Sequence, residues 1–133
     1  MEESLILETT FLIDFEREIH RKKEGHAFRF LSKYQDSQLY ITFTIAGELA
    51  SGASLSDRIR WDSFLEPFQV LDCTREVCWQ YGQLYRHLQK NRSIIGSNDL
   101  WIASTAVAYG LPLVTKNLEH YKRIPHLEII PYT

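Results

Sequence analysis

The sequence predicts an α/β fold of three layers, in which helices cover both faces of a mainly parallel sheet of about four to five strands. Short apolar or β-branched runs alternate along the chain with segments of helical periodicity. No internal repeat and no Gly/Pro/Ser-rich linker interrupts this alternation. With 133 residues, 44% of them hydrophobic, the chain fits a single domain over residues 1–133.

The N-terminal elements begin with Leu5–Leu7, an apolar run typical of a strand that is covered on both faces. Polar residues follow, and apolar residues then return with helical spacing over Phe11–Glu18 and over His26–Tyr34. Leu39–Phe43 is β-branched and aromatic, which predicts the second strand. Thr44 is the expected N-cap of the helix that comes next.

The central elements follow that helix, which should end near Gly52. Leu55–Leu65 predicts a further helix, and Pro67 interrupts the helical pattern. Phe68–Leu71 then predicts a short strand, and Thr74–Gln89 a long amphipathic helix.

The C-terminal elements start at Ser97, the expected cap of an alanine-rich helix over Asn98–Tyr109. Pro112–Thr115 predicts a strand, Leu118–Tyr121 a turn of helix, and Leu127–Ile130 a last strand.

Charge and cysteine content exclude several classes. A formal charge of −2 and a pI near 6.2 argue against binding of nucleic acid by bulk electrostatics alone. Neither a signal peptide nor an apolar run of membrane-spanning length is visible, so we expect a cytoplasmic protein without a membrane partner. Cys73 and Cys78 have no metal-ligand spacing, and reduced, half-buried thiols are expected.

Polar side chains gather where the predicted strands end, and ligands bind outside the carboxyl ends of strands in open parallel sheets. The candidates are Glu8, Glu48, Asp99 and Asn117. Taken singly, each has a simpler interpretation as a helix-dipole carboxylate, an exposed helical glutamate or a turn residue. Taken together, three acids at one edge repel one another unless a cation is bound or one acid is protonated. Oxygen ligands suit Mg²⁺ or Mn²⁺, and such an ion favours phosphodiester hydrolysis.

Four segments carry a resemblance to a known family. They are Leu5–Asp14 (LILETTFLID), Ile41–Gly52 (ITFTIAGELASG), Ile95–Ala103 (IGSNDLWIA) and Leu111–Asn117 (LPLVTKN). With these segments the chain resembles, nearly end to end, a PIN domain of the VapC type, the ribonuclease toxin of bacterial toxin–antitoxin pairs. The resemblance implies a metal-dependent endoribonuclease with Mg²⁺ or Mn²⁺ as cofactor and RNA as substrate. It also implies a homodimer and a VapB-type antitoxin with which the toxin forms a higher assembly.

The resemblance also implies roles for single residues. Glu8, Glu48 and Asp99 would be the metal ligands, and Asn117 would complete the catalytic set where family members carry Asp or Asn. Thr10 would support the first acid, and Thr115 would present its hydroxyl beside the site. The family normally carries Asp at the position of Glu8, and glutamate is longer by one methylene.

Other interpretations stay open from the sequence. Because of Glu8, the chain could be a weakened or inactive PIN domain that binds RNA or antitoxin without cutting. A receiver-type phosphoacceptor domain would use Asp72 and Lys116, although a single acid follows the first strand. His120 is expected on the rim of the site rather than on substrate phosphate. Asp14 is expected to be a supporting or solvated acid. The aromatic residues Trp79, Tyr81 and Tyr85 are candidates for a dimer face.

Overall fold

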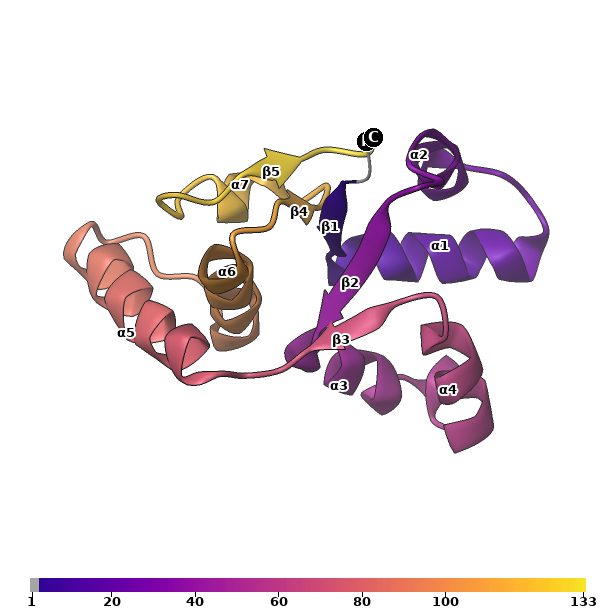
Figure 1. Ribbon diagram of the computed structural model, residues 1–133, viewed down its shortest axis with the longest axis horizontal. Coiled ribbons are helices and arrows are strands. Elements are labelled where there is room, and N and C mark those ends of the chain that lie inside the picture. The colour runs from indigo at the N-terminus through magenta and orange to yellow at the C-terminus, as the bar shows by residue number, and fades with distance from the viewer. Residues whose placement is uncertain (1–2) are drawn as a thin grey trace.

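A five-stranded parallel sheet forms the middle layer of the computed structural model, which describes residues 3–133 (Figure 1). Its strands are β1 (Ser4–Leu7), β2 (Gln38–Thr42), β3 (Gln69–Leu71), β4 (Leu113–Val114) and β5 (Ile129–Ile130). They lie in the order β3-β2-β1-β4-β5, and every neighbouring pair is parallel. The predicted fold class is therefore confirmed, and the first strand of the chain lies at the centre of the sheet.

Helices cover both faces of this sheet. They are α1 (Thr9–Arg21), α2 (His26–Lys33), α3 (Phe43–Ser51), α4 (Arg58–Leu65), α5 (Arg75–Lys90), α6 (Ser97–Tyr109) and α7 (Leu118–Tyr121), with a 3₁₀ turn, η1, over Ala53–Leu55. In Figure 1, α1 and α2 lie on one side of the sheet, whereas α5 and α6 pack together on the other. Within residues 3–133, no helix has the length and apolar character needed to cross a membrane.

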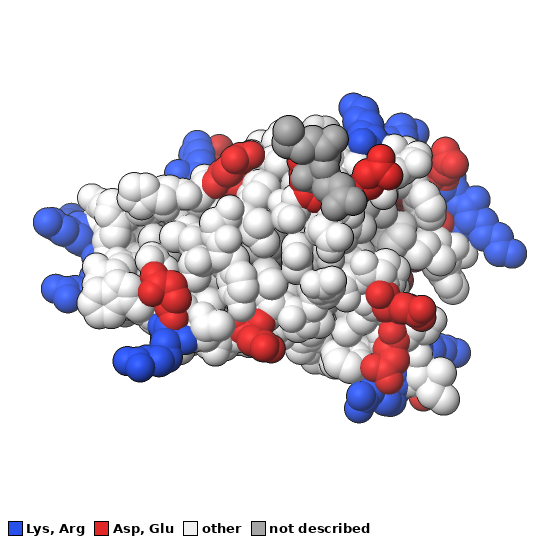
Figure 2. All heavy atoms as spheres, in the orientation of Figure 1, with Lys and Arg blue, Asp and Glu red and all other residues white. Residues whose placement is uncertain are grey.

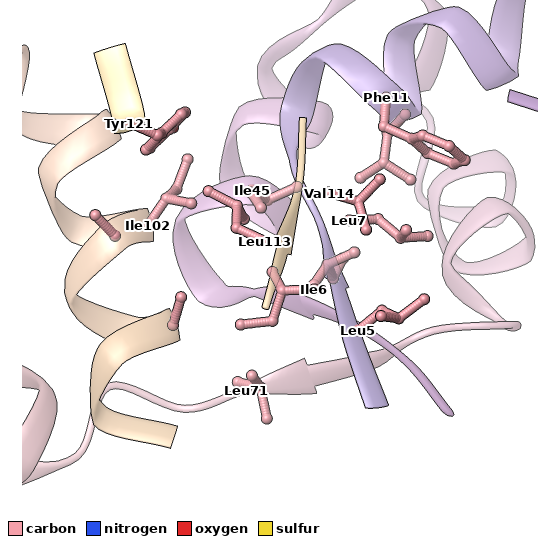
Figure 3. Close-up of a cluster of buried hydrophobic side chains, with 14 of the residues drawn as sticks. Leu5, Ile6, Leu7, Phe11, Ile45, Leu71, Ile102, Leu113, Val114 and Tyr121 are labelled. Carbon is pink, nitrogen blue, oxygen red and sulfur yellow. The ribbon is translucent and has the colours of Figure 1, made fainter. Parts of the chain in front are cut away.

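The core is built by strand residues that alternate between the two faces. Leu5 and Leu7 of β1 point toward Phe11 of α1, and Ile6 points to the opposite side, where Ile102 of α6 lies (Figure 3). All five side chains are completely buried. Burial of such a side chain stabilises the fold by about 1.5–3 kcal/mol. Because helices cover both faces of the sheet, the central strand is apolar throughout Leu5–Leu7.

The starts of the helices differ in part from the expectation. Thr42, rather than Thr44, caps α3: its backbone is extended, and its hydroxyl accepts a 3.2 Å hydrogen bond from the Ile45 amide. The strand ends before Phe43, so Thr44 already lies inside the first helical turn. Thr74 caps α5 as expected, with a 3.2 Å bond from the Val77 amide.

Two further boundaries need correction. The helix predicted over Leu55–Leu65 is divided into η1 and α4, because Asp57 takes extended geometry and caps α4 by accepting from the Arg60 amide. The alanine-rich helix begins at Ser97 itself, so the cap position falls on Gly96, which has no side chain to accept a bond.

The two cysteines are exposed, which contradicts the expected half-buried state. Their sulfur atoms lie 3.7 Å apart. Cys73 precedes the cap residue Thr74, and Cys78 lies in the first turns of α5. The residue before the cap and the fourth residue of a helix often carry apolar side chains that contact each other, and here these two positions are Cys73 and Cys78.

Candidate active site

The site begins at the carboxyl ends of the two central strands. Leu7 of β1 pairs with Val114 of β4, so Glu8 and Thr115, the next residues, lie side by side. Oε1 of Glu8 accepts two short hydrogen bonds, one of 2.7 Å from the Thr10 hydroxyl and one of 2.6 Å from the Thr115 hydroxyl. Glu8 is 3% exposed, and Thr115 is completely buried. A carboxylate is thus fixed at the floor of the site by two hydroxyls.

Burial dominates the electrostatics of Glu8. It raises the pKa of this carboxyl above its ordinary value, and the nearby charge of Asp99 adds to the effect. The hydrogen bonds from Thr115 and Thr10 oppose the rise without cancelling it. A buried carboxylate that hydrogen bonds compensate only partly is stabilised when a cation binds next to it.

Glu48 lies on α3 and reaches the site from that helix. Its Oε1 accepts a 2.9 Å hydrogen bond from the Thr9 hydroxyl at the start of α1. Its Oε2 lies 3.4 Å from the side-chain amide nitrogen of Asn98 in the first turn of α6. Glu48 therefore connects α1 and α6, the helices on the two sides of the sheet.

Asp99 enters the site from α6. Its Oδ1 accepts a 3.2 Å hydrogen bond from the hydroxyl of Tyr121, and its Oδ2 lies 3.1 Å from Nδ1 of His120. Tyr121 is completely buried. Burial raises the pKa of its hydroxyl, and the charges of Glu8, Asp99 and Glu48 raise it further. Two neighbouring residues of α7 therefore hold Asp99, while Glu48 bonds to the residues next to Glu8 and Asp99.

Asn117 lies at the start of α7, close to the same group. Its amide N–H donates a 2.9 Å hydrogen bond to the Thr115 hydroxyl, and its side-chain nitrogen lies 3.1 Å from Nδ1 of His120. His120 thus contacts both Asn117 and Asp99, and its side chain is 44% exposed, which fits the expected place on the rim of the site. Because Nδ1 cannot donate to Asp99 and accept from Asn117 at once, the ring tautomer selects one of these partners.

The structure brings together every residue that the sequence proposed for the site: Glu8, Thr10, Glu48, Asp99, Thr115 and Asn117. Their catalytic and metal-binding roles stay predictions. Sequence reasoning missed Thr9, Asn98 and Tyr121, although Thr9 and Asn98 are direct neighbours of proposed residues. Asp72 follows the edge strand β3, and β2 separates that strand from β1. The arrangement therefore does not support a receiver-type site built on Asp72.

The donor set fits a hard divalent cation. Mg²⁺ usually keeps several waters and binds through one or two carboxylates instead of a complete protein cage. In the described part of the chain, no group of three or more His, Cys, Asp or Glu side chains is already arranged around one point as metal ligands. The reason is visible in the contacts: Glu48 is engaged by Thr9 and Asn98, and Asp99 by His120 and Tyr121. A cation would have to draw these oxygens inward.

Comparison with known proteins identifies the family. The PIN domain model matches residues 5–127. The chain belongs to the PIN domain family. Within that family, the VapC type inferred from the sequence motifs is confirmed by relatives along most of the chain. "Ribonuclease VapC2" of Rickettsia felis is 35% identical over 98 residues, which is 70% of this chain and 73% of the relative. "Ribonuclease VapC" of Rickettsia bellii is 33% identical over 137 residues, covering 95% and 94%.

Solved structures of VapC-type PIN proteins share the fold. VapBC2 from Rickettsia felis, bound to a DNA fragment from its promoter, matches with a TM-score of 0.82 and 28% identity, covering 98% of this chain and 99% of that chain. VapBC-1 from nontypeable Haemophilus influenzae matches with a TM-score of 0.80 and 27% identity, covering 97% and 98%.

Proposed function

We propose that this PIN-domain chain is a metal-dependent endoribonuclease, the toxin of a type II toxin–antitoxin pair, and that it hydrolyses RNA phosphodiesters with Mg²⁺ or Mn²⁺. The observation that carries the proposal is a set of contacts that joins the three acids at the carboxyl edge of the sheet. Glu48 bonds to Thr9 and Asn98, the neighbours of Glu8 and Asp99, and a chain of contacts through Thr115, Asn117 and His120 links Glu8 to Asp99. The relatives named above are ribonucleases by name, which supports RNA as the substrate.

In the proposed mechanism, Glu8, Glu48 and Asp99 hold the cation, which when bound polarises a phosphoryl oxygen and lowers the pKa of a bound water. Thr10 and Thr115 keep Glu8 in place by donating to its Oε1, and its Oε2 would be the oxygen left to bind the cation. The side-chain amide of Asn117 binds a water or a phosphate oxygen at the same edge.

The charge distribution supports recognition by local contacts. On the face shown in Figure 2, Lys and Arg side chains lie mainly toward the periphery, with acidic side chains among them. The whole chain has a formal charge of −2. The net charge and this face favour binding of the substrate by the site and its immediate surroundings.

The test is cleavage of total RNA and transfer RNA in the presence of Mg²⁺, Mn²⁺ or a chelator. Asp99→Asn should lower the rate by more than about 100-fold, because it removes a ligand charge. Asp62→Asn is a matched control, since Asp62 forms an exposed ion pair with Arg58 in α4. Cleavage that persists in a clean Asp99→Asn preparation, or in the chelator, would contradict the proposal.

A second candidate is a PIN domain that binds RNA or antitoxin without cutting. It is favoured by Glu8, whose longer side chain stands where the resemblance leads one to expect aspartate. Glu8→Asp separates the two functions. A gain of cleavage would identify a weakened enzyme, whereas RNA binding without cleavage by both chains would favour the binding function.

A VapB-type antitoxin is the proposed partner, because the matched structures named above are those of VapBC2 and VapBC-1. A groove of about 730 Å³ between α1 and α4 offers a surface for such a partner. Ile59 is 79% exposed there, and Phe15, Ile19 and Phe64 line the same groove. We further propose a homodimer and a cytoplasmic location. Trp79 is 62% exposed on α5 and is available for a dimer contact.

A further inference from the structure

Asp14 receives two hydrogen bonds at a single oxygen. Nζ of Lys116 donates to its Oδ2 over 2.8 Å, and the hydroxyl of Tyr132 donates to the same atom over 2.7 Å. These residues come from three separate segments: α1, the connection between β4 and α7, and the tail after β5. The carboxylate of Asp14 therefore joins three parts of the chain that are distant in sequence.

Each partner of Asp14 is directly connected to the candidate site. Lys116 lies between Thr115, which donates to Glu8, and Asn117, whose amide donates back to Thr115. Tyr132 packs against Phe11, the residue that follows Thr10 in α1, and the Thr10 hydroxyl donates to Glu8. The two residues whose hydroxyls fix Glu8, Thr10 and Thr115, are thus each next in the chain to a residue in contact with Asp14 or with its partner Tyr132.

The surroundings distinguish this cluster from an ordinary surface ion pair. Tyr132 is buried, and its ring packs edge-on against Phe11 with centroids 4.8 Å apart. The side chain of Asp14 is 21% exposed, whereas both members of the Arg58–Asp62 pair are mostly exposed. Exposed pairs contribute little because solvent screens them, but a partly buried carboxylate with two donors fixes the positions of its neighbours.

We propose that Asp14 is a positioning residue which, through Lys116 and Tyr132, fixes the 115–117 segment and the first turn of α1 against Glu8 and thereby sets the affinity of the site for a divalent cation. The inference rests on the proposed function, since it assumes that Glu8 is a metal ligand. Asp14 itself does not touch the reacting atoms. It acts in the way that residues behind metal ligands orient those ligands and tune their affinity.

The first measurement is the affinity for Mn²⁺ alone, read from the electron paramagnetic resonance signal of the free ion with the full chain. Asp14→Asn keeps the size of the side chain and removes its charge, and the Mn²⁺ dissociation constant should rise about tenfold. Tyr132→Phe should raise it by a smaller factor. Asp62→Asn, which removes the same charge from an exposed pair, should leave it unchanged.

The second measurement is amide hydrogen exchange of the metal-free protein. The Asn117 amide, bonded to Thr115, should exchange faster in Asp14→Asn than in wild type, and it should be unaltered in Asp62→Asn. Equal Mn²⁺ affinity and equal exchange in Asp14→Asn and Asp62→Asn would overturn the inference. If Asp14→Asn does not fold, Tyr132→Phe and Lys116→Met answer the same question.

A role of Lys116 in binding RNA directly would give a different pattern. Lys116→Met would then weaken RNA binding and leave Mn²⁺ affinity unchanged, which would overturn the positioning role. The same experiments distinguish failure of the proposed function from failure of this inference. Wild type that neither binds Mn²⁺ nor cleaves RNA removes both proposals, whereas wild type that does both beside an unaffected Asp14→Asn removes this inference alone.

Discussion

Replacement of Thr115 by valine tests how the buried carboxylate of Glu8 is stabilised. The change keeps the shape of the side chain and deletes a hydroxyl that makes two hydrogen bonds. That hydroxyl donates to Glu8 Oε1 over 2.6 Å and accepts from the Asn117 amide over 2.9 Å. A hydrogen bond to a charged group contributes about 1.5–3 kcal/mol, and an amide left partly buried without a partner costs about 1 kcal/mol or more. The free energy of unfolding should therefore fall by about 3 kcal/mol.

The assay is urea unfolding of the metal-free chain at neutral pH, with Thr105→Val as the control. Thr105 is equally buried, but its hydroxyl donates only to a backbone carbonyl of its own helix. Loss of the Thr105 hydroxyl should lower the free energy of unfolding by no more than about 1 kcal/mol. At a pH low enough to protonate Glu8 in the folded state, the deficit of Thr115→Val should shrink, because the lost bond served the anion. A Thr115→Val deficit no larger than that of Thr105→Val, or one independent of pH, would refute this account.

Three further results are expected. Thr44→Val should raise the midpoint of urea unfolding or leave it unchanged, because the Thr44 hydroxyl is buried and has no partner among the described residues. A fall in the free energy of unfolding of more than about 1 kcal/mol would contradict this prediction. Burial favours protonation of Asp14, but the donors Lys116 and Tyr132 outweigh it and hold its pKa below the ordinary value. The stability that Asp14 contributes is thus present above its unfolded pKa of about 3.9 and is lost as the pH falls through the lower folded pKa. The difference in free energy of unfolding between wild type and Asp14→Asn should therefore narrow as the pH falls below about 5, and it should go on narrowing until the pH is below the folded pKa. Oxidised glutathione should join Cys73 and Cys78 in a disulfide, in which the chain loses two hydrogen atoms and glutathione is reduced. Peptide mass spectrometry detects the disulfide. The closed loop should raise the free energy of unfolding by about 2 kcal/mol.

The fold could be predicted from the sequence because its strongest signals are local. Leu5–Leu7 is apolar throughout, since both faces of the central strand are covered, and it reads as a buried strand without further information. The ends of helices and strands were harder to predict. Thr42 and Thr44 are chemically identical cap candidates, and the choice depends on where pairing with β1 and β3 stops. Pairing between strands is a long-range property that neither threonine reveals.

The composition of the site could be predicted, but its contacts could not. Parallel strands deliver the residues after them to one edge, so Glu8 and Asn117 could be placed together from order along the chain alone. The bond from Thr9 to Glu48 joins residues 39 positions apart and depends on a rotamer. The contact of His120 with Asp99 depends on how the short helix α7 is set against α6. Packing of side chains decides such contacts, and periodicity does not record it.

The central place of β1 divides the site into parts of unequal local stability. Glu8 continues a fully buried strand and directly precedes α1, so its amide, bonded to Val114, should open to solvent only when the whole sheet unfolds. Asn117 and His120 follow a strand of two residues; Asn117 is the N-cap of the four-residue helix α7, and His120 lies on that helix. So short an element should open at a lower free energy than the central strand. The first carboxylate should therefore be in place as soon as the chain has folded, while the opposite wall should open more readily. A cation that joins the two parts should slow exchange selectively in residues 117–121 and leave the protection of the central strand unchanged.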